Sequence, residues 1–330
     1  MHCVIETNDS TFSHYWEKLY ANDPLQNPLY AQQSYECHDL INEQGHFTDR
    51  SFLVVFEDEP VFGCSLTMHT DDQGRKCMGY FGMEASTHVN RASMQQASNN
   101  FQPEAIRLLQ QHINHLIEEI QPDSLHYLDP VSCGIMSPVT QVLLEKGAIP
   151  ILQKAQVIDL TPSAHSLIRN MKKSHRSFIN WGRRHLSIDV ISGQGFDSEK
   201  SAHLQAMHQE TISLGNSPFS SWRVYEQLIR QGNAFLVQGN YMGELTASTL
   251  FLHTEKTCHY VFGDTSHDSP DRPVLHALIW KAMMHSRALG CSQFHLGNRS
   301  ATNAEDSADE KLVTGFGGEA RTQLKVSLIY

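Results

Sequence analysis

The densest group of side chains that could bind a ligand is a run of basic residues in the middle of the chain. Six cations occur here without an acidic residue between them: Arg169, Lys172, Lys173, Arg176, Arg183 and Arg184. Spacings of three, four and seven would place the first four of these on one face of a helix. Because the whole chain has a net charge of -11, this face would be a concentrated site for an anion.

Candidate anions for this face are the phosphates of CoA, a nucleotide sugar, a lipid pyrophosphate or tRNA. Four cations are predicted as ligands: Lys172, Lys173, Arg176 and Arg183. Trp181 and Phe178 could stack on a base or pack in the core. The alternative for the basic residues is a solvated helix face without a ligand.

Other motifs that carry chemistry are absent or incomplete. His112-x-x-His115 and His203-x4-His208 lack a third ligand and the H-E-x-x-H form, so no metal site is predicted. The sequence has no G-x-S-x-G, which argues against a hydrolase nucleophile elbow. No P-loop and no G-x-G-x-x-G follows a predicted strand. The seven cysteines include no C-x-x-C, so zinc ribbons and redox pairs are not expected.

Length and composition indicate a globular protein of two domains. The 330 residues are 40% hydrophobic and 18% charged, which excludes disordered and fibrous classes. The negative net charge argues against binding nucleic acid over the whole surface. The N-terminus lacks the basic start and apolar stretch of a signal peptide, and no apolar run is long enough to span a membrane. With scattered single cysteines, these features predict a cytoplasmic protein.

The elements that must position the candidate residues occur in the same order in both halves. In the first half, residues 51–70 predict two strands joined by a turn at 58–60, and 76–83 a third strand. A polar loop at 86–100 precedes a helix over 103–120, whose apolar residues recur at helical spacing. A short strand starting at Leu125 and a helix over 137–148 follow.

The second half predicts three strands within 233–265, with turns at 239–240 and 254–256. A helix over 274–290, a strand over 291–297, an acidic loop over 298–311 and a last strand complete it. Between the halves, 161–232 reads as mostly helical. The repeated order indicates a structural duplication of an α/β unit.

Four segments, in order along the chain, resemble the FemAB-like branch of the GNAT acyltransferases. Residues 26–36 (QNPLYAQQSYE) are similar to its N-terminal proline-containing segment, and 171–190 resemble its basic helix and following strand. Residues 262–297 resemble its strand, open loop, proline, long helix, glycine and strand. Residues 315–319 (GFGGE) resemble its Phe-Gly-Gly ending.

This resemblance implies two tandem GNAT-like domains, each a mixed, mostly antiparallel sheet flanked by helices. We expect a degenerate N-terminal domain at 1–160 and, at 161–330, a C-terminal domain with the basic helix and the donor site. Family members transfer an acyl or aminoacyl group to an amine, and the donor is an acyl-CoA in some and a charged tRNA in others.

The resemblance also implies where the donor lies. In GNAT domains the fourth strand splays from the fifth, and pantetheine occupies the gap; here the strands would be 258–264 and 293–297. The pyrophosphate is expected at the start of the next helix, although Asp268 and Asp271 would repel it, and a capped helix without ligand is the alternative. Donor contacts are predicted at Phe262, Gly263, Arg272, Pro273, Val274 and Asn298.

The catalytic base is predicted to be His295 or Asp264. A histidine with a pKa near 6.5 can take a proton from an ammonium group at neutral pH. Alternatively, Gly263 and Asp264 have no role in binding or catalysis and only start a turn. His295 stands where the family often has an aspartate, and Leu312-Val313 replaces a Phe-Lys pair.

These features predict an N-acyltransferase that uses acyl-CoA as its donor substrate, with no metal. The acceptor would be an amine of an amino sugar or a lipid-linked cell-envelope precursor, as in polysaccharide biosynthesis. One alternative is a tRNA-dependent aminoacyl transferase of the Fem type; the sequence leaves no room for that group's helical-hairpin arm. The other is a non-catalytic module that binds a glycan precursor.

Overall fold

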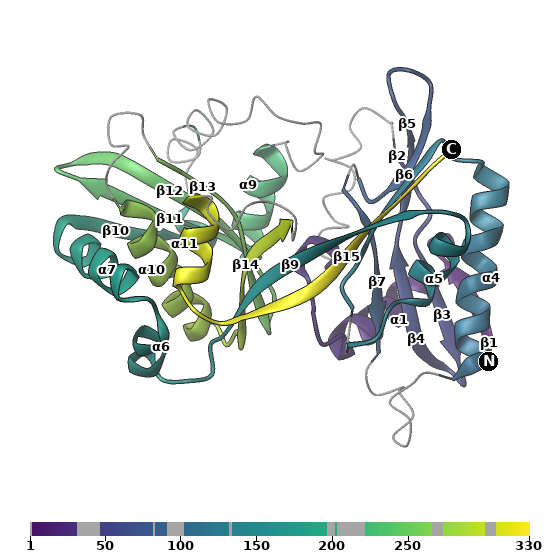
Figure 1. Cartoon of the computed structure of the whole chain (residues 1–330), viewed down its shortest axis with the longest axis horizontal. Coiled ribbons are helices and arrows are strands. Elements are labelled where there is room, and N and C mark those ends of the chain that lie inside the picture. The colour runs from purple at the N-terminus through teal and green to yellow at the C-terminus, as the bar shows by residue number, and fades with distance from the viewer. Residues whose placement is uncertain are drawn as a thin grey trace.

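The computed structural model of this chain describes residues 2–31, 47–81, 83–90, 102–131, 134–196, 202, 222–265, 273–300 and 308–330. Strands from both halves of the chain join in one large mixed sheet, and helices cover both of its faces (Figure 1). This architecture confirms the mixed α/β fold class. In the part of the chain that is described, no helix is long and apolar enough to cross a membrane.

The first half of the chain supplies a mostly antiparallel portion of the sheet. Five strands lie side by side in chain order: β1 (His2–Glu6), β3 (Phe52–Phe56), β4 (Glu59–Ser65), β7 (Ala85–Val89) and β8 (Ser124–Asp129). Three shorter strands pair with one another, and the last of them also pairs with β8: β2 (Phe47–Asp49), β5 (Thr67–Thr70) and β6 (Lys76–Gly79). The pairing of β7 with β8 is parallel, as a connecting helix requires.

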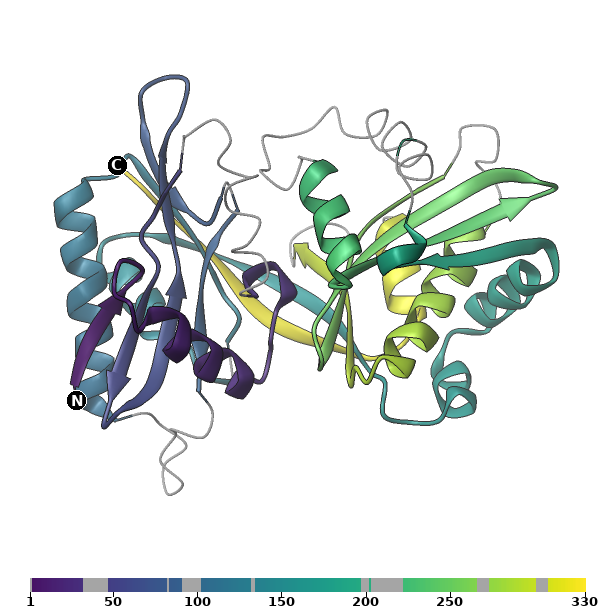
Figure 2. The ribbon, with the colours of Figure 1, turned by 180° about the vertical axis from the view of Figure 1, so that it is seen from behind.

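Helices cover this portion on both faces (Figure 2). Helix α1 (Phe12–Asn22) packs on one face, and helices α4 (Pro103–Ile120) and α5 (Pro138–Glu145) pack on the other. The alternation of side chains along β3 accounts for the two cores. Leu53 and Val55 pack against α1, whereas Phe52 and Val54 pack in the core beneath α4.

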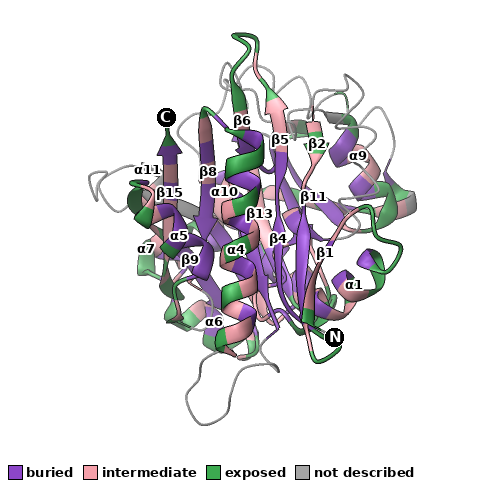
Figure 3. Ribbon diagram, turned by 90° about the vertical axis from the view of Figure 1, so that its right-hand side faces the viewer, coloured by how far each residue is buried: buried purple, intermediate pink, exposed green. Residues whose placement is uncertain are grey.

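Helix α4 has the bounds that its apolar spacing predicted. Six side chains form its buried stripe: Ala105, Leu109, Ile113, Leu116, Ile117 and Ile120. Pro103 occupies the first turn, where its missing N–H is not needed. Gln121 adopts a left-handed conformation with a φ of 50° and ends the helix. Figure 3 shows the buried inner side and the exposed outer side of this helix.

The rest of the sheet combines β9, from the end of the first half, with strands of the second half. The strands lie in the order β9 (Ile149–Asp159), β14 (Gln293–Ser300), β13 (Thr257–Thr265), β12 (Glu244–His253), β11 (Ala234–Tyr241) and β10 (Leu186–Ile191). Helices α7 (Lys173–His185) and α10 (Val274–Ala288) pack on one face. Helix α9 (Trp222–Gln231) packs on the other. The three strands predicted within 233–265 are therefore confirmed.

Two long strands join the halves. Strand β15 (Glu319–Ile329) pairs with β9 from Glu319 to Ser327, and its end also pairs with β8 in the first half. The other edge of β9 pairs with β14 of the second half. The C-terminal strand therefore crosses the molecule and completes the sheet of the first half (Figure 1).

Two predicted turns lie elsewhere. The first hairpin turns at Glu57 and Asp58, both at positive φ, as in a two-residue turn, and the predicted turn residue Glu59 already begins β4. The pair at 239–240 lies within β11, where a bulge interrupts the register, and the chain turns at Met242–Gly243. The turn at 254–256 is confirmed.

Two predicted loops contain regular structure. The sequence ASTHV forms β7, which overlaps the start of the polar loop predicted at 86–100, and all five of its residues are buried. Residues 91–100 of that predicted loop lie outside the described residues. Strand β14 continues to Ser300, inside the acidic loop predicted at 298–311, and α11 (Ala308–Gly315) begins before the end of that loop. Both segments are rich in small or polar residues, so they lack the apolar alternation that identifies a strand or helix.

Candidate acyl-transfer site

The main feature of the site is the divergence of β13 from β14. These parallel strands pair at only three positions: Thr257 with Gln293, Cys258 with Phe294 and His259 with His295. Beyond His259, β13 remains paired with β12 as far as Thr265. Beyond His295, β14 remains paired with β9 instead. The splay that the family resemblance implied is therefore present.

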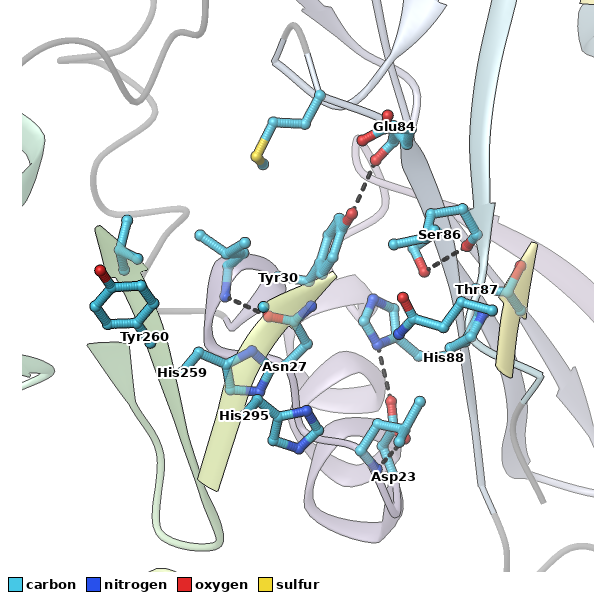
Figure 4. A pocket seen from close by; sticks show the side chains of 18 residues that line it. Asp23, Asn27, Tyr30, Glu84, Ser86, Thr87, His88, His259, Tyr260 and His295 are labelled. Carbon is cyan, nitrogen blue, oxygen red and sulfur yellow. Dashed lines mark hydrogen bonds and ion pairs between the residues drawn. The ribbon is translucent and has the colours of Figure 1, made fainter. Parts of the chain in front are cut away.

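A cavity of about 230 Å³ lies where the two strands separate (Figure 4). The second half of the chain contributes one wall: His259, Tyr260, Val261, His295, Gly297 and Gln323. The first half contributes the opposite wall, mainly from the segment 23–30 after α1 and from β7. A ligand in this cavity would contact both halves of the protein.

The backbone on both sides of the divergence is irregular. Val261 is the extra residue of a bulge, because the pairing with β12 passes from Tyr260 directly to Phe262. On β14, Leu296 and Gly297 together face one residue of β9, and Gly297 has a φ of 92°. No atom lies within 4 Å of the position that a Cβ of Gly297 would occupy. The backbone can therefore approach a ligand closely here.

His259 and His295 stand at the mouth of the divergence. Their rings stack with centroids 4.1 Å apart and planes 10° apart. Burial, and secondly the positive charge of Arg321, lowers the pKa of His295 to about 4. Burial and the neighbouring His295 lower the pKa of His259 well below its ordinary value. Both rings are therefore neutral at pH 7, and His295 is a weak base.

The opposite wall contains a buried chain of hydrogen bonds between Asp23, His88 and Ser65, which we call the Asp23–His88–Ser65 relay. His88 Nδ1 lies 2.9 Å from Asp23 Oδ2, and His88 Nε2 lies 3.1 Å from Ser65 Oγ. Asp23 and His88 are 2% and 3% exposed, so this contact fixes the segment after α1 against β7. Sequence reasoning did not identify the relay, because 65 residues separate its aspartate from its histidine.

Farther along the same wall, the Tyr30 hydroxyl donates to the Glu84 carbonyl at 2.8 Å. The Glu84 carboxylate forms an ion pair with Lys325 of β15. Both carboxylates in the described cavity wall, Asp23 and Glu84, therefore already have partners. No lysine or arginine side chain belongs to the described lining.

Of the predicted site residues with described side chains, His295 alone lines this cavity. Asp264 is buried near the end of β13, opposite Ser248, outside the lining. The Cβ position of Gly263 lies 2.7 Å from both the Thr249 methyl and the Tyr260 hydroxyl, so internal packing already accounts for this glycine. Phe262 faces α9, with its ring 6.0 Å from that of Tyr225.

The predicted donor residues at the start of α10 are partly described. Pro273 caps this helix, and Val274 begins it with a fully buried side chain in the core, so only the Val274 backbone could face a ligand. Arg272, like Asp268 and Asp271, lies outside the described residues. The Asn298 side chain is also outside them, although its backbone pairs with Ala155.

The predicted single basic helix is wrong, because the segment forms two helices. Met171 and Lys172 have extended backbone between α6 (Ala164–Asn170) and α7, with ψ values of 154° and 146°. The break is held by the GFGG segment, since the Lys172 amide donates to the Gly315 carbonyl at 2.9 Å. Four of the six cations are exposed on α7 or at its start: Lys172, Lys173, Arg183 and Arg184.

The two aromatic residues of this segment have protein neighbours. The Trp181 ring stacks on Tyr241 with centroids 6.0 Å apart. The Phe178 ring lies edge-on to His276 at 4.8 Å, although 37% of Phe178 is exposed. These contacts favour packing over the stacking of a base.

Comparison with known proteins extends this description. No family model and no curated protein sequence matches the chain. A solved structure of FemX is similar, with a TM-score of 0.70 and 11% identity, over 97% of this chain and 96% of that one. A tandem GNAT protein from the clavulanic acid biosynthesis pathway, solved without AcCoA, has a TM-score of 0.58 and 11% identity, over 100% and 98%.

A third similar structure is the C-terminal domain of a putative lysylphosphatidylglycerol synthetase from Agrobacterium fabrum. Its TM-score is 0.50 at 12% identity, over 96% of this chain and 90% of that one. The likenesses show that this chain has the tandem GNAT fold.

Proposed function

We propose that this protein is an N-acyltransferase that moves an acyl group from acyl-CoA to an amine. The observation that carries the proposal is the separation of β13 from β14 after three paired positions, with a cavity at the point of separation. The space that such a divergence leaves can hold the amide-containing arm of a thioester donor, which can hydrogen-bond to strand backbone. The bulge at Val261 adds an irregular backbone position beside the cavity.

In this function the carbonyl of the acyl donor would lie beside Val261. The acceptor amine would enter the cavity from the wall that the first half of the chain forms. The protein needs to hold both reactants close and to stabilise the negative charge that develops on the carbonyl oxygen. His295 lines the cavity and is the proposed catalytic residue. Asp264, which lies outside the lining, is the second candidate.

The chemistry of the cavity wall favours a particular part of the acceptor. The described lining contains two carboxylates, five histidine, asparagine or glutamine side chains on its two sides, and no lysine or arginine. An amine with neighbouring hydroxyl groups suits such a wall better than a phosphate does. This lining supports an amino sugar, or an amine of a cell-envelope precursor, as the acceptor, which the protein would bind in the cytoplasm.

Phosphates of the donor or acceptor would bind elsewhere. The exposed cations at the start and end of α7, namely Lys172, Lys173 and Arg183, are the proposed anion contacts together with the less exposed Arg176. The start of α10 would supply backbone N–H groups that bind phosphate. The proposed neighbours of the acyl-CoA are Phe262, Gly263, Arg272, Pro273, Val274 and Asn298. The division into domains at residue 160 stays a prediction.

Thermal unfolding with CoA, acetyl-CoA, longer acyl-CoAs and nucleotide sugars tests this function. A ligand that binds the folded state alone at 100 times its Kd raises the free energy of unfolding by about 2.7 kcal/mol. The proposal expects such a shift with acyl-CoA, followed by thiol release and amide formation when amino sugars are added. A shift with nucleotide sugars and with no CoA compound would instead indicate a glycan-binding module.

The exposed cations and the likeness to a putative lysylphosphatidylglycerol synthetase favour a second candidate, aminoacyl transfer from tRNA. Filter binding of tRNA at increasing salt distinguishes the two. A protein that neutralises several phosphates loses affinity steeply with salt, at a slope of about −0.9 per contact on duplex nucleic acid. Specific binding with such a slope, together with no response to acyl-CoA, would replace our first proposal.

A further inference from the structure

The stacked pair His259–His295 occupies the last paired position before β13 and β14 diverge. Neighbouring positions of parallel strands project their side chains to the same face of the sheet. The adjacent residues Cys258 and Phe294 point into the core beneath α10, so the two histidines point the other way. Both of them line the cavity, as Figure 4 shows.

Neither ring has a hydrogen-bond partner in the described part of the chain. The Nε2 atoms of both rings are buried and unsatisfied. His295 is 7% exposed, so water does not readily replace the missing partners. Buried polar atoms are nearly always paired, and unpaired ones are costly to the fold. Two such rings side by side at a cavity indicate that a ligand supplies their partners.

The surroundings of the pair keep it uncharged. Arg321 of β15 repels a proton on His295, and His295 in turn lowers the pKa of His259. On the facing wall, Asp23 is engaged by His88, and Glu84 is engaged by Lys325. No free carboxylate in the described lining is therefore available to stabilise an imidazolium.

We propose that His259 and His295 act together as neutral hydrogen-bond donors to the carbonyl oxygen of the acyl donor. An N–H donor lies about 3 Å from its acceptor oxygen. One oxygen can be that far from a nitrogen of each of two rings whose centres are 4.1 Å apart. The pair would then be an oxyanion site made of side chains, with His259 as a further catalytic residue, and His295 would donate rather than accept a proton.

The uncharged amine nitrogen bonds to the thioester carbon, and the C=O π electrons move to the oxygen, which accepts the hydrogen bonds of the two rings. The electron pair then returns to re-form the C=O bond, and the C–S bond breaks. The proton on the attacking nitrogen passes to the departing thiolate, so the products are an amide and free CoA. The rings keep their own protons throughout.

This inference rests on the proposed acyl-CoA function, and one NMR experiment tests both. The histidine rings of the whole protein would be labelled with ¹⁵N, and their signals assigned with His259→Phe and His295→Phe, which retain an aromatic ring for stacking. Acetyl-CoA and CoA would be added separately. CoA is the matched control, because it is the donor without its acetyl group.

We expect both compounds to bind and both rings to stay neutral from pH 5.5 to 8. Acetyl-CoA should shift the ring-nitrogen signals of His259 and His295, whereas CoA should leave them in place. Binding of both compounds with equal shifts, or with no shift, would overturn the role of the pair while leaving the acyl-CoA function intact. If neither compound binds, the acyl-CoA function fails, and this inference fails with it.

Discussion

Replacement of Gly315 by alanine tests how the GFGG segment is packed. An added Cβ would lie 1.9 Å from Cε1 of the His175 ring, which is far inside contact distance. The ring cannot easily move, because His175 is 4% exposed and its Nε2 donates to the Leu312 carbonyl at 2.8 Å. Phe316 and His276 also pack against it, with ring centroids 5.1 and 4.5 Å away.

The expected cost combines two effects. Forcing an extra methyl group into a filled core costs about 1–3 kcal/mol. Displacing the ring also loses the hydrogen bond to Leu312, a net contribution of about 0.5–1.5 kcal/mol. Gly315→Ala should therefore lower the free energy of unfolding by about 1.5–4.5 kcal/mol. The alanine should also disturb the start of α7, because the Lys172 amide is bonded to the Gly315 carbonyl.

Urea unfolding monitored by circular dichroism measures this effect. The matched control is Gly195→Ala, since no atom lies within 4 Å of its Cβ position and its φ is not in the positive range. The control should unfold within about 0.5 kcal/mol of the unmodified protein, as surface substitutions generally do. Equal stabilities for the two variants would refute the packing that we describe around His175.

Three other predictions address charge and protonation. The double variant Lys172→Glu plus Arg176→Glu should weaken acyl-CoA binding at least about tenfold without lowering Tm. The control Lys281→Glu, which changes an exposed cation on α10, should bind acyl-CoA as the unmodified protein does. Calorimetric titration measures both affinities. Folding lowers the pKa of His295 from 6.5 to about 4, so between these pH values only the unfolded chain binds this proton. The free energy of unfolding therefore decreases as the pH falls from 6.5 to about 4. His295→Gln should reduce that decrease by about 3 kcal/mol in urea unfolding. Burial raises the pKa of the Cys64 thiol to about 12, so iodoacetamide should modify Cys64 only after unfolding, as peptide mass mapping would show.

The parts of the fold that the sequence predicted are those with a strong local pattern. Helix α4 carries apolar residues at every third or fourth position, and β11 and β12 contain apolar runs bounded by turn residues. Strand β7 was missed because a strand buried on both faces needs no alternation, and its small and polar residues resemble a loop. The pairing of β15 with β8 joins residues about 200 apart, and no local pattern encodes such a contact.

The candidate site was predictable only in outline. The order of strand, loop, helix and strand located the divergence of β13 from β14. The family resemblance predicted that the acyl donor binds there. The opposite wall was not predictable, because Asp23 and His88 come together only when α1 packs on β7. The basic segment was read as one helix, since helical spacing does not reveal the tertiary contact with Gly315 that breaks it.

A crystal structure of the protein with acetyl-CoA tests the central claim most directly. We predict that the pantetheine arm lies between β13 and β14 beyond His259 and His295, with the acetyl carbonyl at the cavity beside Val261. Acetyl-CoA bound elsewhere, with the space between the two strands filled by protein side chains, would contradict the account.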